Sequence, residues 1–294
     1  MANARIIVKR RKSVRNIRKI TRTMQLIATA RFQAAFARAT ATKAYTEQLS
    51  GLVADLSAVL GEELRHSLMQ PRPDVRRSAL VVLTSGRGLC GGYNTSVLRL
   101  AIGQLDVEQG DGREVEVYMV GKKGISFFRF LRRAMHERIT HIGDAPRFDA
   151  VKEIADGLMQ RFLTGEVSAV NVAYMKFFSA GKQRPHLLQL LPLARESTED
   201  ASKPSTVTNV QYEFSPKPEE LLEELLPASV RVRLFQCFID AAVSEQTARM
   251  VAMKAATESA AEMITSLSRK YNRARQTQIT MELLDIVGGA NALA

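Results

Sequence analysis

The sequence has few of the residues that bind metals or form disulfide bonds. Its two cysteines, Cys90 and Cys237, lie far apart and outside any metal-ligand spacing. Its four histidines form neither an HExxH motif nor another paired-ligand pattern. We therefore expect reduced, structural cysteines, no metal site and no bound cofactor.

Long apolar runs are also missing. No run approaches the ~20 apolar residues that cross a bilayer, and the N-terminus enters basic residues without the apolar stretch of a signal peptide. The N-terminal segment is arginine-rich, as a transit peptide would be, but it merges into a continuous heptad pattern. We expect a chain that stays outside the bilayer and is of bacterial cytoplasmic origin.

Acidic residues are absent from the first 46 positions, which hold twelve lysines and arginines. The rest of the chain has thirty residues of each sign, so the net charge of +12 belongs to this one segment. A basic block indicates an anionic partner, such as nucleic acid, an acidic membrane surface or the acidic wall of another protein. Charge alone does not choose among these partners.

Glycine and proline are absent from residues 1–50 and 228–287, which favours two long helices because both residues are costly inside a helix. We predict an N-terminal helix over 1–60 and a C-terminal helix within 216–290, starting after Pro227 and ending at Gly288-Gly289. Sixty helical residues span about 90 Å. The two helices are therefore predicted to pair as one antiparallel coiled coil.

Apolar residues recur at multiples of seven in both segments, as a coiled-coil seam requires. The N-terminal segment has two such rows, Ile17, Met24, Tyr45, Leu52 and Val59, and Val14, Thr21, Ala28, Ala35, Thr42, Leu49 and Leu56. The C-terminal segment has one, broken only at Gln246: Val232, Ile239, Met253, Ala260, Leu267, Ala274 and Met281. Small residues in the second row would allow a partner helix to approach closely.

The central segment, 74–212, has a different period. Residues 79–83, 115–120 and 167–178 are predicted strands, separated by helical stretches near 94–105, 123–133 and 149–163. Alternating strands and helices indicate a Rossmann-like α/β domain with a largely parallel sheet. Residues 195–209 are rich in Ser, Thr and charge and are predicted to form a surface loop or linker.

A GxGxxG motif, GRGLCG over 86–91, follows the first predicted strand and suggests a dinucleotide-binding enzyme. The acidic residue that would bind the ribose is missing, because the next strand runs into Gly121-Lys122. No Lys-Ser or Lys-Thr pair makes the motif a P-loop. The favoured interpretation is a structural tight turn that uses the backbone freedom of its glycines, Gly86, Gly88, Gly91 and Gly92.

Two other functions remain as alternatives. The basic N-terminal helix could be a nucleic-acid arm, but its best partner seam lies some 200 residues away in the same chain rather than further along the same helix. An enzyme would need a nucleophile beside a base or a paired acid and base, and neither is recognisable. These observations favour a mechanical or binding role without nucleic acid.

Four stretches in order resemble the gamma subunits of F-type ATP synthases, bacterial type, over essentially the whole chain. The opening helix over 11–24 reads RKSVRNIRKITRTM, and the central loop over 86–94 reads GRGLCGGYN. The return helix contains SEQTARMVAM over 244–253, and YNRARQTQITMELLDIVGGA over 271–290 is the closest match. An ordered set of this kind is far more specific than any one of its members.

The resemblance implies a non-catalytic rotor of the central stalk. Its paired helices would form a shaft inside the alpha and beta subunits, and its foot would sit on the membrane c-ring with the epsilon subunit. Membrane association would come only through the complex, on the cytoplasmic face of the bacterial inner membrane. By analogy, the contacts with the catalytic beta subunits are Met24, Arg249, Gln276 and Thr280, and the contacts with ring and epsilon are Tyr212 and Phe214. Arg249, Gln276 and Thr280 are expected to face outward from the seam.

Overall fold

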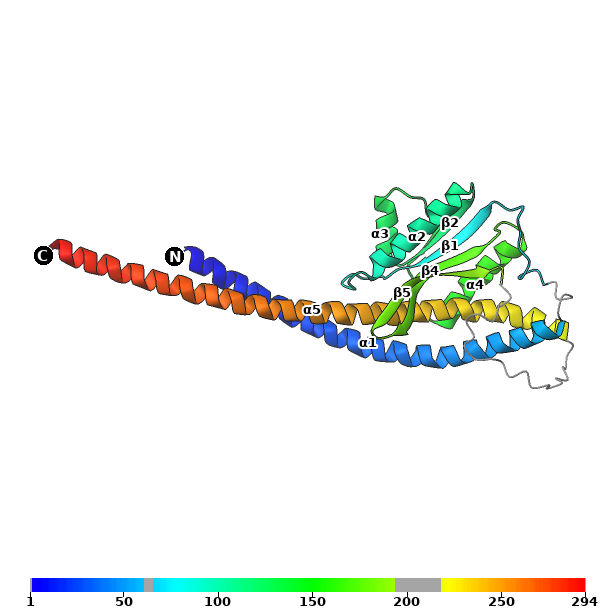
Figure 1. The fold of residues 1–294 in the computed structure, drawn as a ribbon, viewed down its shortest axis with the longest axis horizontal. Coiled ribbons are helices and arrows are strands. Elements are labelled where there is room, and N and C mark those ends of the chain that lie inside the picture. The colour runs from blue at the N-terminus through cyan, green and yellow to red at the C-terminus, as the bar shows by residue number, and fades with distance from the viewer. Residues whose placement is uncertain (1, 61–65, 194–217, 294) are drawn as a thin grey trace. The chain divides into compact units, whose positions relative to one another are not determined.

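The structure is a computed structural model that describes residues 2–60, 66–193 and 218–293. It divides into two compact units. The shaft unit comprises Met1–Ala30 and Arg249–Ala294, and the head unit comprises Arg31–Ala248. Helices α1 (Ala2–Leu60) and α5 (Pro218–Leu293) each run through both units (Figure 1).

The head unit contains a five-stranded sheet in the order β3-β2-β1-β4-β5. The strands are β1 (Arg77–Leu83), β2 (Glu114–Val120), β3 (Glu137–Ile139), β4 (Val170–Ser179) and β5 (Lys182–Leu191). Strands β1 to β4 are parallel to one another, and β5 pairs antiparallel with β4 as a hairpin. The order β3-β2-β1-β4 is that of doubly wound sheets, which confirms the Rossmann-like α/β prediction.

Helices cover both faces of this sheet (Figure 1). Helices α2 (Tyr93–Gly110) and α3 (Lys122–Phe130) pack on one face, and α4 (Phe148–Leu163) and the head part of α5 pack on the other. Strand β1 contributes to the core on both faces of the sheet, because its successive side chains point to opposite faces. Ala79, Val81 and Leu83 join the α4 and α5 layer, whereas Leu80 and Val82 join the α2 and α3 layer.

The predicted strands 79–83, 115–120 and 167–178 and the three predicted helices of the middle segment are all present, with small shifts of their ends. Strands β3 and β5 were not predicted. Strand β3 has only three residues, and β5 contains Pro185, which argues against a central strand. Because β5 lies at the sheet edge, a proline is tolerated there.

The C-terminal helix fills the predicted 216–290 segment, but the boundaries expected at Pro227 and at Gly288-Gly289 were wrong. Helix α5 begins at Pro218, runs through Pro227 and continues past Gly288-Gly289 to Leu293. A proline inside a helix removes one backbone hydrogen bond, and this helix offsets the loss by burying Leu222, Leu226 and Val230 in the head core. The predicted linker over 195–209 lies outside the described residues.

No helix among the described residues is long and apolar enough to cross a membrane. Within the same residues, no group of three His, Cys, Asp or Glu side chains could hold a metal ion.

Candidate functional site: the shaft and the glycine-rich loop

The shaft unit is an antiparallel helix pair, as its contacts show. Val14 of α1 packs with Ala260 and Leu267 of α5 in a small buried cluster. Further along α1, the hydroxyl of Thr257 donates a hydrogen bond of 2.9 Å to the hydroxyl of Thr21. A residue later in α1 therefore contacts a residue earlier in α5, which confirms the predicted antiparallel pairing.

The seam of α1 is the second predicted row. Val14, Thr21, Ala28 and Ala35 are buried, and Ala28 is only 1% exposed. Ile17, from the first predicted row, is 51% exposed. The small side chains face the partner because they allow the closest approach of two helix backbones. The side chains of Leu56 and Val59 lie outside those described.

Much of the apolar surface of the shaft unit has no cover from within the described chain. Figure 1 shows α5 continuing beyond the N-terminal end of α1. The exposed large apolar residues of this unit are Ile6, Val8, Ile17, Ile20, Leu26, Ile27, Val251, Met263, Ile279, Met281, Leu283, Leu284, Ile286 and Val287. Large exposed apolar surfaces mark interaction sites. Basic side chains surround this surface on α1, where Arg10, Lys12, Arg15, Arg18 and Lys19 are exposed.

The predicted contact residues of the shaft differ in exposure. Gln276 and Thr280 are exposed, and Met24 is half-buried. Thr280 donates a hydrogen bond of 3.0 Å to the carbonyl of Gln276, one turn earlier in its own helix. Arg249 is only 5% exposed, so the expectation that it faces outward was wrong. It lies three residues after Gln246 and four before Met253, and this spacing puts it on the buried face of α5. Tyr212 and Phe214 lie outside the described residues.

The glycine-rich loop after β1 is closed by its own side chains. The Ser85 backbone N–H donates to the side-chain oxygen of Asn94 at 2.9 Å, and the Ser85 hydroxyl donates to the Arg87 carbonyl at 2.6 Å. The Asn94 amide nitrogen lies 3.2 Å from the Cys90 sulfur. These bonds support the interpretation of GRGLCGG as a structural turn.

The backbone N–H groups at the start of α3 also donate hydrogen bonds within the chain. The Lys123 N–H donates to the Ser85 carbonyl at 3.1 Å, and the Gly124 N–H donates to the Thr84 hydroxyl at 3.0 Å. These bonds tie the start of α3 to the end of β1.

The four loop glycines are not equivalent. Gly91 has a φ of 56°, a left-handed conformation that favours glycine. A side chain at Gly88 would meet only the flexible end of Lys123, at 3.3 Å, and at Gly86 it would meet nothing within 4 Å. Gly92 has an ordinary φ of −81°. The structural role of these glycines stays a prediction, with Gly91 as the position whose backbone supports it.

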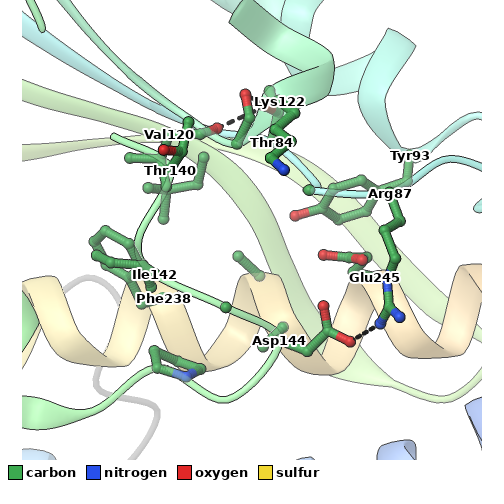
Figure 2. A pocket seen from close by; sticks show the side chains of 17 residues that line it. Thr84, Arg87, Tyr93, Val120, Lys122, Thr140, Ile142, Asp144, Phe238 and Glu245 are labelled. Atoms are coloured by element: carbon green, nitrogen blue, oxygen red, sulfur yellow. Dashed lines mark hydrogen bonds and ion pairs between the residues drawn. The ribbon is translucent and has the colours of Figure 1, made fainter. Parts of the chain in front are cut away.

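A cavity of about 180 Å³ lies between the carboxyl edge of the sheet and the head part of α5. Figure 2 shows the side chains that line it. Its wall is mainly apolar, and its rim carries an ion pair between Arg87 and Asp144. Asp144 also pairs with Arg31 of α1, so one carboxylate connects the glycine-rich loop to a long helix. Sequence reasoning missed Asp144 because its partners are 57 and 113 positions away.

A cluster of buried titratable groups lies where α5 crosses β4 in the head unit. Burial raises the pKa of Asp240 to about 6, although a hydrogen bond from Gln236 and the nearby Lys176 and Lys43 lower it. Burial and the Asp240 charge raise the pKa of the Cys237 thiol to about 12. The cysteine is therefore an unreactive thiol in the core, as predicted.

Comparisons with known proteins agree with these features. The family model described as ATP synthase matches residues 3–293. The ATP synthase gamma chain of Rhodopirellula baltica is 48% identical, with 100% of this chain and 99% of the relative covered. The ATP synthase gamma chain of Leptospira biflexa is 39% identical, and both chains are covered fully.

Solved structures give the same fold. A chain from the Euglena gracilis mitochondrial ATP synthase aligns with a TM-score of 0.65 and 17% identity. The alignment covers 99% of this chain and 95% of the Euglena chain. A chain from the central stalk and c-ring of the Tetrahymena thermophila mitochondrial ATP synthase gives a TM-score of 0.59 at 21% identity. That alignment covers 81% of this chain and 99% of the Tetrahymena chain. The chain therefore belongs to the ATP synthase gamma chain family and is a non-catalytic rotor subunit in the central stalk of an F-type ATP synthase, a membrane-associated complex.

Proposed function

We propose that the shaft unit turns inside a ring of alpha and beta subunits and couples ion flow through a membrane ring to ATP synthesis or hydrolysis in the beta subunits. The observation that carries this proposal is the exposed apolar surface of α1 and α5. Such a surface is costly in water, and a surrounding partner would remove that cost. The exposed basic side chains of α1 would complement an acidic inner wall.

The mechanism needs no chemistry in this chain. An asymmetric shaft presents a different face to each of three equivalent catalytic subunits, and each face favours a different conformation of its neighbour. Such a population shift requires contacts that differ in free energy between the two conformations. Met24, Gln276 and Thr280 are proposed to make these contacts. Arg249 is proposed to act from the buried face, by holding the shaft in shape.

The head unit is proposed as the foot of the rotor, near the c-ring and the epsilon subunit. Tyr212 and Phe214 remain the proposed ring and epsilon contacts, from the family resemblance alone. The whole assembly would lie on the cytoplasmic face of a bacterial inner membrane. Copurification tests the partners: a stable complex with alpha, beta and epsilon is expected, and a chain that purifies alone or with nucleic acid would contradict the assignment.

The role of the shaft contacts is tested in the purified complex. We expect Gln276→Ala combined with Thr280→Ala to leave subunit stoichiometry unchanged but to slow ATP hydrolysis or weaken ATP-driven ion transport. Gln160→Ala is the matched control, because Gln160 is an exposed glutamine on α4 of the head unit. Unchanged rates and coupling in the double variant would remove these two residues from the contact surface.

A further inference from the structure

Helix α3 has an apolar face that the head core does not use. Ile125 and Phe128 are buried against the sheet. Phe127, Phe130 and Leu131 follow the i, i+3, i+4 spacing of a second face and are 36%, 81% and 39% exposed. Phe130 has the largest exposed fraction of the large apolar side chains described. We call these three residues the α3 face.

The segment that carries the α3 face is rich in positive charge. Residues 122–136 contain five lysines and arginines and no Asp or Glu: Lys122, Lys123, Arg129, Arg132 and Arg133. Arg133 pairs with Asp106 of α2 at 2.8 Å. Among the described residues, no ion pair holds Arg129 or Arg132. Their charge is therefore available to a partner outside the chain.

The end of α3 carries an arginine in a position that suits glycine. The Arg133 N–H donates to the Phe128 carbonyl at 3.0 Å, and the Arg132 N–H donates to the Arg129 carbonyl at 3.1 Å. This pair of bonds is the Schellman motif, whose left-handed residue is usually glycine. Here that residue is Arg132, with a φ of 54°. An exposed arginine kept at a backbone cost points to a use for its side chain.

We propose that the α3 face docks on the surface of an anionic lipid bilayer. Exposed aromatic and aliphatic side chains in a segment rich in lysine and arginine are the composition of segments that lie in the membrane interface. Each cation near an anionic leaflet adds to the attraction. The complex to which this family belongs is membrane-associated.

A lipid surface suits a rotor better than a fixed protein does. A stationary acidic protein would meet the α3 face at only some rotary angles, whereas a fluid leaflet presents the same negative charge at every angle. The charge complementarity is with the lipid phosphates, and the phenylalanine rings would lie among the upper acyl carbons. This inference does not depend on torque transfer, so its test uses the isolated full chain.

The absence of tryptophan from the sequence permits a local test. Phe130→Trp places the only indole on the α3 face. Phe178→Trp is the matched control, because Phe178 is 52% exposed and has Lys176 and Lys182 each 5.5 Å from its ring. The control therefore shares exposure and positive charge but lies on β4. It also corrects for attraction of vesicles to the basic N-terminal helix.

Tryptophan emission is measured with vesicles of phosphatidylglycerol and phosphatidylcholine, with vesicles of phosphatidylcholine alone, and with brominated lipids. We expect Phe130→Trp to shift to the blue and to be quenched by brominated lipid only when phosphatidylglycerol is present. Phe178→Trp should show neither effect. Equal responses of the two variants, or no response of either, would overturn the proposal.

Arg132→Gly in the Phe130→Trp background separates a binding role from a structural one. Glycine should raise the melting temperature, because it removes the left-handed strain. Losing the cation should nevertheless lower the vesicle affinity at this site about fivefold. Unchanged insertion would contradict the proposal. The proposal would also be contradicted if the emission of the Phe130→Trp indole does not change with vesicles but the indole is shielded from solvent in the detergent-purified complex. The partner of the α3 face would then be a protein.

Discussion

Replacing Gln246 with leucine should stabilise the isolated chain. Gln246 is 1% exposed and breaks an otherwise apolar heptad row of α5, in which Val232, Ile239 and Met253 are also buried. Neither the nitrogen nor the oxygen of its side-chain amide has a hydrogen-bond partner among the described residues. The chain therefore carries the desolvation cost of an amide without the bonds that would offset it.

The expected gain follows from that cost. Burying an amide without partners costs roughly 1–3 kcal/mol in mutational data. Leucine has a similar volume and adds no polar atom, so most of this cost should be recovered. For a chain of this size, each kcal/mol corresponds to roughly 2–4 °C in melting temperature. We therefore expect a rise of about 2–10 °C.

Circular dichroism of thermal and urea unfolding measures the effect on the isolated chain. Gln276→Leu is the matched control, because it makes the same change at an exposed position of the same helix, and it should alter stability by less than about 0.5 kcal/mol. A lower melting temperature for Gln246→Leu than for the parent chain would refute the reasoning. It would mean that the amide is satisfied by water in the seam.

Two further changes test other parts of the head unit. Gly121→Ala should lower the free energy of urea unfolding by about 3 kcal/mol or more, because Gly121 has a φ of 94° and its new Cβ would lie 2.7 Å from the Thr84 carbonyl carbon. Gly86→Ala is the control, because nothing lies within 4 Å of a Cβ at that position. Equal effects of the two substitutions would contradict the clash. Asp240, whose pKa is raised from 3.8 to about 6, binds its proton more tightly in the folded chain. It should therefore add up to about 3 kcal/mol of stability as the pH falls through 6 toward 4, and this gain is lost as the pH rises. Asp240→Asn should flatten that dependence, and an unchanged slope between pH 7 and pH 4.5 would contradict it.

The sequence predicted the head sheet well where strands are buried on both faces. Residues 79–83 form a continuous run of apolar, mostly β-branched or aliphatic side chains, and β1 lies at the centre of the sheet. Strand β5 lies at the edge, so its pattern is weaker and tolerates Pro185. Local signals are strongest where burial is complete.

The sequence was less informative about the long helices. Two heptad rows were visible in α1, and only the partner determines which one is buried. The Val14 and Ala28 row is buried, and Ile17 is exposed. Pro227 and Gly288 were expected to bound α5 because both disfavour helix, but the helix runs through both. Propensity is a weak prior that tertiary packing can override.

The candidate site was predictable in part. The glycine-rich turn and the exposure of Gln276 and Thr280 follow from motif and spacing, and the missing acid after β2 argued against a dinucleotide. The burial of Arg249 was missed because a charged residue was expected to face solvent. Its position on the heptad face was visible in the sequence, and that spacing was the better guide.

Direct observation of rotation would test the rotor role most directly. The complex is immobilised through its catalytic subunits, a bead is attached to an exposed engineered cysteine at Gln160 of the head unit, and ATP is added. Unidirectional, stepwise rotation of the bead, at a rate that rises with ATP concentration and matches ATP turnover, is the expected result. ATP hydrolysis at the normal rate with a bead that only fluctuates about one angle would contradict a rotor role for this chain.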